Sequence, residues 1–179
     1  KDSTLKRKKV FFHFVVDENP NIKVKTGISA VSIEGAKNNL EAEIPHWDFE
    51  KTKSETQEKW NKELSKIEVE MMTAEETTVF YTALYHSYLN PNTFNDVDGK
   101  YRGTDLEIHQ SEGFDNYTIF SLWDTYRSEH PLFVITQEKK TLDFIHTFLN
   151  QYKNGGKLPV WELAGNYTGC MIGYHSIPV

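Results

Sequence analysis

The 179 residues suffice for one ordinary domain or two small ones, and 38% hydrophobic with 13% aromatic residues is too apolar a composition for a disordered chain. No run approaches the roughly 18 consecutive apolar residues of a membrane-spanning helix, and the net charge of −6 argues against a basic face for duplex nucleic acid. A single cysteine, Cys170, excludes an internal disulfide or a multi-cysteine zinc site, and without a basic neighbour it is expected to be a buried structural thiol.

The first third of the chain is expected to form β-strands. Residues 10–16 are apolar on both faces, as in a strand covered on both sides, and a turn is expected at residues 17–21. Apolar and polar side chains alternate over residues 22–31, which is typical of a strand with one wet face. Together these strands form a predicted hairpin. A hairpin alone is marginal in water, so the first strand requires neighbours that this sequence does not supply.

The residues after the predicted hairpin have apolar side chains at the spacing of α-helices. Residues 34–43 are expected to form a short helix, and Asp48 is a suitable N-cap for a second helix that runs to about Ile67. Apolar residues are sparse in this second helix, so we expect it at a surface or between two parts. Thr73 and Glu76 have the spacing of a capping box at the start of a third helix.

The second half of the chain begins with a segment of no clear period. This segment, residues 91–116, is expected to be a long loop, and such loops are usually functional. Helical spacing is expected to resume at residues 117–130 and to break at Pro131. A cleaner helix is expected over residues 137–152, with its stop at residues 154–156. One side of this helix is apolar and consists of Leu142, Ile145, Leu149 and Tyr152.

The loop contains two groups of possible metal ligands. Residues 96–100 do not fit a calcium loop, because glycine stands at the fourth place and lysine at the fifth, so an Asp-Gly turn is the simpler interpretation. His109, Glu112 and Asp115 are close in sequence and could bind a metal ion or a polar substrate. A solvated, locally hydrogen-bonded cluster is the commoner outcome for such a group.

Trp123 and Asp124 place an indole beside an acid inside an apolar stretch. A carboxylate buried there needs a partner, and Arg127, three residues later, is a suitable one. A saccharide site favours the same pair, because an aromatic face covers C–H groups while a carboxylate accepts hydroxyl hydrogens. The pair is therefore either structural or part of a sugar site.

A second tryptophan–acid pair lies near the end of the chain. Trp161 precedes Glu162, and Asn166 follows in a glycine-containing turn. The structural alternative is a glycine-rich connection capped by the asparagine. The sequence has no glycine-rich phosphate loop, Ser/His/Asp arrangement or zinc spacing, so paired carboxylates are the only enzyme chemistry that it could support unaided.

Four motifs follow one another along the chain: Phe80–Ser87, Asp96–Gly103, Ser121–Arg127, and Trp161–Asn166 with Gly169–His175. In this order they closely resemble glycoside hydrolase family 92, the exo-acting α-mannosidases abundant in gut Bacteroides-type bacteria. Residues 27–43 also resemble the passage from the sandwich domain of that family into its linker helices. The resemblance spans nearly the whole chain.

The resemblance implies a mixed, mostly α architecture that is larger than this chain. Family members have an N-terminal β-sandwich, linker helices and an (α/α)6 barrel. Residues 1–33 would be the last strands of the sandwich, residues 34–70 the linker helices, and residues 71–179 the first helical hairpins of the catalytic barrel. This chain would then be a fragment, which accounts for the apolar first strand without neighbours.

The resemblance also implies calcium-dependent hydrolysis of α-mannosidic bonds with inversion, with α-1,2 bonds of mannans or N-glycans as expected substrates. The enzyme would be periplasmic, at the cell surface or secreted, with α-mannoside oligosaccharides and the remainder of the same enzyme as partners. The catalytic acid, the base and the calcium ligands are expected beyond this chain, which alone would be inactive.

Within this chain the resemblance implies substrate contacts. They are Trp123, Asp124, Glu162, Asn166 and His175. Asp124 is expected to accept hydrogen bonds from sugar hydroxyls in the −1 subsite. Tyr167 stands where the family is expected to have an acid, which favours Glu162 over Asn166 as a contact.

Two other functions stay open on the sequence. In a non-catalytic carbohydrate-binding module, Trp123 and Trp161 would stack on sugars without hydrolysis. In a helical interaction module, a patch near Phe49 and Trp60 would bind a protein partner, and no sugar would have an effect.

Overall fold

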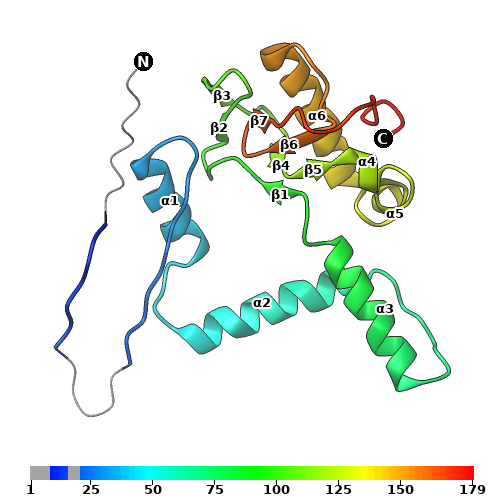
Figure 1. Cartoon of the computed structure of the whole chain (residues 1–179). Helices are drawn as coiled ribbons and strands as arrows, with labels where there is room; N and C mark the ends of the chain where they lie inside the picture. Colours follow the sequence, from blue (N-terminus) through cyan, green and yellow to red (C-terminus); the bar gives the residue numbers. More distant parts are fainter. Residues whose placement is uncertain (1–8, 16–20) are drawn as a thin grey trace.

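The computed structural model describes residues 9–15 and 21–179, and it has two regions of different character (Figure 1). The open region, residues 9–91, carries extended segments and three helices. These are α1 (Ile33–Glu43), α2 (Phe49–Leu64) and α3 (Ala74–Ser87). No helix among the described residues combines the length and the apolar character that crossing a membrane requires.

The compact region, residues 92–179, carries three helices and three small antiparallel sheets, in the orders β1–β4, β2–β3 and β5–β6–β7. The strands are β1 (Asn92–Thr93), β2 (Lys100–Arg102), β3 (Ile108–Gln110), β4 (Tyr117–Thr118), β5 (Phe120–Ser121), β6 (Trp161–Leu163) and β7 (Asn166–Tyr167). The helices are α4 (Leu122–Thr125), α5 (Glu129–Thr136) and α6 (Glu138–Gly155). The chain is thus mixed, with helices and small antiparallel sheets.

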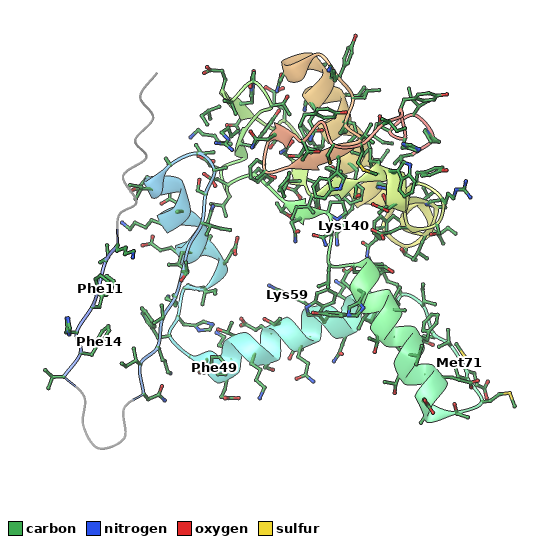
Figure 2. All side chains as sticks on the ribbon, viewed as in Figure 1. Phe11, Phe14, Phe49, Lys59, Met71 and Lys140 are labelled. Carbon is green, nitrogen blue, oxygen red and sulfur yellow. The ribbon has the colours of Figure 1, made fainter. Side chains whose placement is uncertain are left out.

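The predicted N-terminal hairpin does not form. Residues 10–15 and 21–31 run as two extended segments, and neither is assigned to a strand in the described part of the chain (Figure 1). Their apolar side chains are exposed, as Phe11 and Phe14 illustrate (Figure 2). The hairpin prediction is wrong because two strands without a covering layer gain too little burial to pair. Residues 16–20, with the end of the first strand and most of the predicted turn, lie outside the described residues.

The helices of the open region begin where the sequence predicts. Asp48 caps α2 by accepting a hydrogen bond from the Lys51 N–H at 3.0 Å. Thr73 and Glu76 form the predicted capping box of α3, with reciprocal bonds of 3.2 and 3.1 Å. α2 ends at Leu64, slightly earlier than expected. Local side-chain caps therefore define these helices well.

An aromatic cluster forms the core of the compact region. Phe120 is buried between Phe144 and Phe148 of α6, with ring centroids 5.7 and 4.8 Å apart in edge-to-face geometry. Phe133 of α5 packs against Phe144 at 5.9 Å. These contacts fix the α5–α6 hairpin against β5, and β5 in turn pairs with β6, which carries the second tryptophan–acid pair.

Residues 91–131 depart from the sequence-based prediction. The segment predicted as one long loop contains β1, β2 and β3, and residues predicted as helical form β4 and β5. Ile119, in left-handed conformation at φ 68°, separates those two strands. Pro131 lies within the first turn of α5, where a missing N–H has no helical partner to lose, so it does not break that helix.

α6 extends as predicted and ends at the predicted stop. Gly156, at φ 75°, forms its left-handed C-cap. The apolar side that the sequence identifies is nevertheless turned to solvent, with Leu142 at 54% exposure. The opposite side is buried, and it carries Thr141, Asp143, Phe144, Thr147, Phe148 and Gln151. The helix therefore has two sides capable of packing, and only one is covered.

Two polar junctions tie the open region to the compact region, and Asp96 is the centre of the first. Its buried carboxylate accepts hydrogen bonds from Ser29 Oγ and from Asn39 Nδ2, both at 2.7 Å. The Asn39 side chain also accepts from the Val97 N–H at 2.8 Å. A Cβ at Gly35 would collide with the Asp96 carboxylate, so α1 approaches this junction closely.

Gln137, between α5 and α6, is the centre of the second junction. It accepts a hydrogen bond from Lys66 Nζ at 2.9 Å and donates one to Glu63 Oε2 at 2.8 Å. Lys140 adds a longer ion pair of 3.9 Å to the same carboxylate, and Figure 2 shows Lys140 on the side of the compact region that faces α2. The end of α2 is thereby attached to the start of α6.

Candidate functional site

The first tryptophan–acid pair lies on the surface of α4. Trp123 is 50% exposed, Asp124 is also exposed, and Ser121 Oγ donates a hydrogen bond to the Asp124 carboxylate. The expectation that Asp124 is buried and paired with Arg127 is wrong, because α4 is a short surface turn. Arg127 instead donates from Nε to the Tyr126 hydroxyl at 2.8 Å. An exposed carboxylate beside an exposed indole is accessible to a polar ligand.

The register of the β5–β6–β7 sheet adds further residues to this surface. Ser121 pairs with Trp161, and Leu163 pairs with Asn166. Paired residues share a face of a sheet and successive residues alternate between faces, so Ser121, Trp161 and Asn166 lie on one face. We call this the outer face. Glu162 lies on the opposite, inner face, together with the core.

Asn166 and His175 border the same area. The Asn166 side chain is exposed, and its Nδ2 donates to the carbonyl of Ala164 at 3.0 Å, which is the capping role considered above. His175 packs against Tyr126 with the rings tilted by 48° and their centroids 4.8 Å apart. Because Tyr126 directly follows α4, this contact places His175 near the helix that carries Asp124. The Nδ1 atom of His175 is buried and has no hydrogen-bond partner among the described residues.

Glu162 is fully buried, with 0% of its surface exposed. Thr118 Oγ1 lies 3.0 Å from both carboxylate oxygens, and the N–H groups of Gly165 and Ile119 donate at 2.6 and 3.2 Å. Burial raises the pKa of Glu162 to about 7, and these hydrogen bonds oppose that rise only in part. Contact between Glu162 and a ligand would require the surrounding turn to open, so its substrate role stays a prediction.

The possible metal ligands of the long loop do not come together, in keeping with the solvated, locally hydrogen-bonded alternative. His109 Nε2 lies 2.9 Å from Asp105 Oδ2, and the nearest cation to Asp115 is Lys139 at 4.0 Å. No group of three or more His, Cys, Asp or Glu residues that could hold a metal ion occurs in residues 9–15 and 21–179. The described residues therefore contain no carboxylate-rich cluster of the kind that usually binds calcium.

Two smaller predictions have opposite outcomes. The Asp-Gly turn forms, since Gly99 adopts φ 81° and its N–H donates to the carbonyl of Asp96 at 2.8 Å. Cys170 is exposed, not buried, with its Sγ 3.1 Å from Thr168 Oγ1. The buried-thiol prediction is wrong because the C-terminal segment that carries Cys170 runs along the surface.

The sequence reasoning missed two residues that hold the site together. Ser121, which binds Asp124, stands three residues before it, a spacing that identifies a helical first turn. Thr118, which binds Glu162, is separated from it by 44 residues, and no local pattern connects them. The first could have been found from the sequence, whereas the second depends on the pairing of distant strands.

Comparison with known proteins found matches to one family of glycosyl hydrolases. The model of the glycosyl hydrolase family 92 catalytic domain matches residues 35–179. The family GH92 α-mannosidase BT3965 from Bacteroides thetaiotaomicron is 43% identical, with a TM-score of 0.76 over 83% of this chain and 20% of that chain. Its structure in complex with mannoimidazole matches with the same values. No curated protein gave a significant match.

A second solved relative has the same extent of similarity. The family GH92 inverting mannosidase BT2199 from Bacteroides thetaiotaomicron VPI-5482 is 31% identical, with a TM-score of 0.76 over 83% of this chain and 20% of that chain. The present chain thus spans about one fifth of the length of these solved relatives.

Proposed function

The chain belongs to glycosyl hydrolase family 92, and on that premise we propose that it is part of an α-mannosidase to which it contributes substrate contacts. The family assignment drawn from the sequence motifs is thereby confirmed. The exposed Trp123–Asp124 pair carries the proposal for this chain, because it combines an apolar face with a hydrogen-bond acceptor on one surface helix. The mannoimidazole complex of the relative BT3965 supports a mannoside as the ligand class.

The exposed residues on and around the outer face have distinct proposed roles. Trp123 would cover the C–H groups of a sugar ring, while Asp124, held by Ser121, would accept hydrogen bonds from its hydroxyls. Asn166 and His175 would border the same ligand from β7 and from the C-terminal segment. The Asp124 carboxylate can accept several hydrogen bonds, and the Ser121 hydroxyl donates only one of them. Acceptor positions therefore remain for sugar hydroxyls.

We propose the domain layout that the resemblance implies. Residues 1–33 would complete a β-sandwich, residues 34–70 would form linker helices, and residues 71–179 would begin an (α/α)6 barrel. Uncovered apolar surfaces support this layout, since the side chains of residues 10–15 and of the outer side of α6 are exposed in the described structure. Additional layers of the sandwich and of the barrel would cover both surfaces.

The chemistry itself is proposed to require groups outside these 179 residues. Inversion needs an acid and a base whose carboxyl groups are about 6.5–9.5 Å apart. Following the family resemblance, we place the acid, the base and the calcium ligands elsewhere in the enzyme. An exo-acting enzyme of this kind, acting on α-1,2 bonds of mannans or N-glycans in the periplasm, at the cell surface or outside the cell, is the full proposal.

Replacement of Asp124 tests the binding role. In the complete enzyme Asp124→Ala should lower kcat/KM by about tenfold to a hundredfold, the effect of losing hydrogen bonds to a charged group. The melting temperature should stay nearly constant, because the side chain is exposed. Asp98→Ala, which removes another exposed carboxylate at 2.6 Å from Lys100, is the matched control and should leave kcat/KM unchanged. An unchanged rate, or an unfolded Asp124 variant, would refute the role.

A carbohydrate-binding module is the second candidate, because the half-exposed Trp123 could stack on a sugar without any catalytic partner. Calorimetric titration of the protein with a mannoside, combined with an assay for released reducing sugar, separates the two functions. Heat of binding without sugar release from the complete protein would favour the module, and sugar release would favour the mannosidase.

A further inference from the structure

The buried carboxylate of Glu162 holds the turn that joins β6 to β7. We propose that Glu162 is a positioning residue, which fixes this turn and through it the outer face with Trp161 and Asn166, and that it does not itself contact the sugar. The proposal rests on the proposed mannoside-binding function of that face. It differs from the sequence-based expectation, in which Glu162 is a direct substrate contact.

The turn has a backbone conformation that requires support. Ala164 and Gly165 adopt φ values of 52° and 73°, and for a residue with a Cβ the left-handed region costs of order 1 kcal/mol. Side chains of other strands bind the polar groups of this turn. Thr118 Oγ1 accepts from the Ala164 N–H at 2.6 Å, and Arg102 Nη2 donates to the Ala164 carbonyl at 2.9 Å.

Glu162 supplies the support at the centre of the turn. Its Oε1 accepts from the Gly165 N–H at 2.6 Å, so the carboxylate binds the residue that directly precedes Asn166. The remaining acceptor positions orient the Thr118 hydroxyl, whose oxygen is then available to the Ala164 N–H. One carboxylate thereby fixes both N–H groups of the turn, directly for one and through a hydroxyl for the other.

The same carboxylate also reaches the strand that leads to Asp124. Its Oε2 accepts from the N–H of Ile119, the left-handed residue between β4 and β5, at 3.2 Å. Ser121, two residues later, holds Asp124 by its hydroxyl. Glu162 therefore binds two backbone segments from the inner side of the sheet. One segment carries Asn166, and the other leads to Ser121 and Asp124.

The turn that Glu162 supports is packed closely against a neighbouring strand. A Cβ at Gly165 would lie 3.0 Å from the carbonyl oxygen of Arg102 and 3.3 Å from Phe94 Cε1, so the turn rests directly on β2. The titratable and charged side chains that line the small polar cavity beside Glu162 are Tyr101, Arg102 and Tyr117. Burial raises the pKa values of both tyrosines, so Arg102 is the charged neighbour at neutral pH.

Hydrogen exchange of the turn amides in the complete enzyme is the first arm of the test. Glu162→Gln keeps the size of the side chain but turns an N–H₂ group toward N–H donors, so exchange at Ala164 and Gly165 should accelerate about tenfold or more. Thr118→Val should accelerate exchange at Ala164. Glu129→Gln is the matched control, because Glu129 is another carboxyl group whose pKa burial raises to about 7, and it lies on α5. Unchanged exchange in Glu162→Gln would overturn the proposal.

Calorimetric titration with methyl α-mannoside is the second arm, at pH 6 and pH 8. The wild-type affinity should rise several-fold between these values, because the ionised carboxylate can accept all of its hydrogen bonds. Glu162→Gln should bind more weakly and without this pH dependence, whereas Glu129→Gln should behave as wild type. Weaker binding with unchanged turn exchange would identify a direct contact and overturn positioning. Faster exchange with unchanged affinity would also overturn positioning, because the turn would then have no influence on the sugar site. A complete wild-type enzyme that binds no mannoside would refute the proposed function, whereas binding by the wild type with unchanged turn exchange in Glu162→Gln would refute positioning alone.

Discussion

The open and the compact regions differ in what holds their helices. In the open region α1 and α2 bury no residue and α3 buries only Leu84, although each helix has a well-formed N-cap. In the compact region α6 lacks a side-chain cap at its start but buries a whole side against β4 and α5. Caps determine where a helix begins, whereas burial determines whether it belongs to a cooperative core.

The contacts between the two regions are polar, whereas the core of the compact region is apolar. Aromatic rings in edge-to-face contact hold the compact region, while the Asp96 and Gln137 junctions tie the open region to it through hydrogen bonds. Hydrogen bonds contribute little net stability compared with the burial of aromatic side chains. The open region should therefore detach before the compact region unfolds, and substitutions can test this order.

Core truncation should have the largest effect and should separate the regions clearly. Phe144→Ala removes a ring that contacts Phe120, Phe133 and Tyr117, and it should lower the free energy of unfolding by about 3–5 kcal/mol. Phe49→Ala, the matched change in the open region, removes an exposed ring and should stay within about 0.5 kcal/mol. Urea denaturation followed by circular dichroism measures both. Similar losses for the two variants would contradict the distinction.

Breaking the first junction should have an intermediate effect that is confined to the open region. Asp96→Ala removes the acceptor for Ser29 and Asn39, and bonds to a charged group are worth about 1.5–3 kcal/mol. Limited proteolysis should then cut residues 21–31 faster, while hydrogen exchange in α6 stays unchanged. Asp98→Ala, in the same turn but paired only with Lys100, is the control. Faster exchange in α6 would show that the two regions unfold together.

Local interactions account for what the sequence predicts correctly. The caps at Asp48 and Thr73 and the stop at Gly156 depend on residues within four positions of each other. The family motifs likewise consist of contiguous residues. Family membership was therefore more accessible from the sequence than architecture, because the motifs identify the family without requiring knowledge of which strands pair.

Long-range pairing accounts for what the sequence does not predict. α6 turns Leu142 outward and Thr147 inward, since the Thr147 hydroxyl accepts a hydrogen bond from the Tyr117 N–H at 3.2 Å while donating to the Asp143 carbonyl. An apolar pattern cannot reveal that a strand end needs a polar partner. For the same reason the placement of Glu162 on the inner face follows from the β5–β6 register and not from its neighbour Trp161.

The pH dependence of stability should give the smallest effect, because buried groups of the compact region act in opposite directions. Burial raises the pKa of Glu162 and Glu129 from 4.5 to about 7, so between these values the folded state keeps protons that the unfolded state has lost, and stability falls as pH rises. Burial lowers the pKa of His130 from 6.5 to about 4, so its contribution rises with pH over that window.

These opposing contributions make the range above pH 7 the most informative. There His130 is mostly neutral in both states, and the two carboxyl groups dominate, so the urea midpoint of the wild-type chain should decrease between about pH 7 and pH 8. Glu162→Gln should show about half of that decrease, and Glu107→Gln, an exposed control, should show all of it. The open region has no buried carboxyl group with a raised pKa in its described part, so proteolysis of residues 21–31 should not follow this profile. A proteolysis rate that tracks the urea midpoint would mean that the two regions share one unfolding transition despite their different packing.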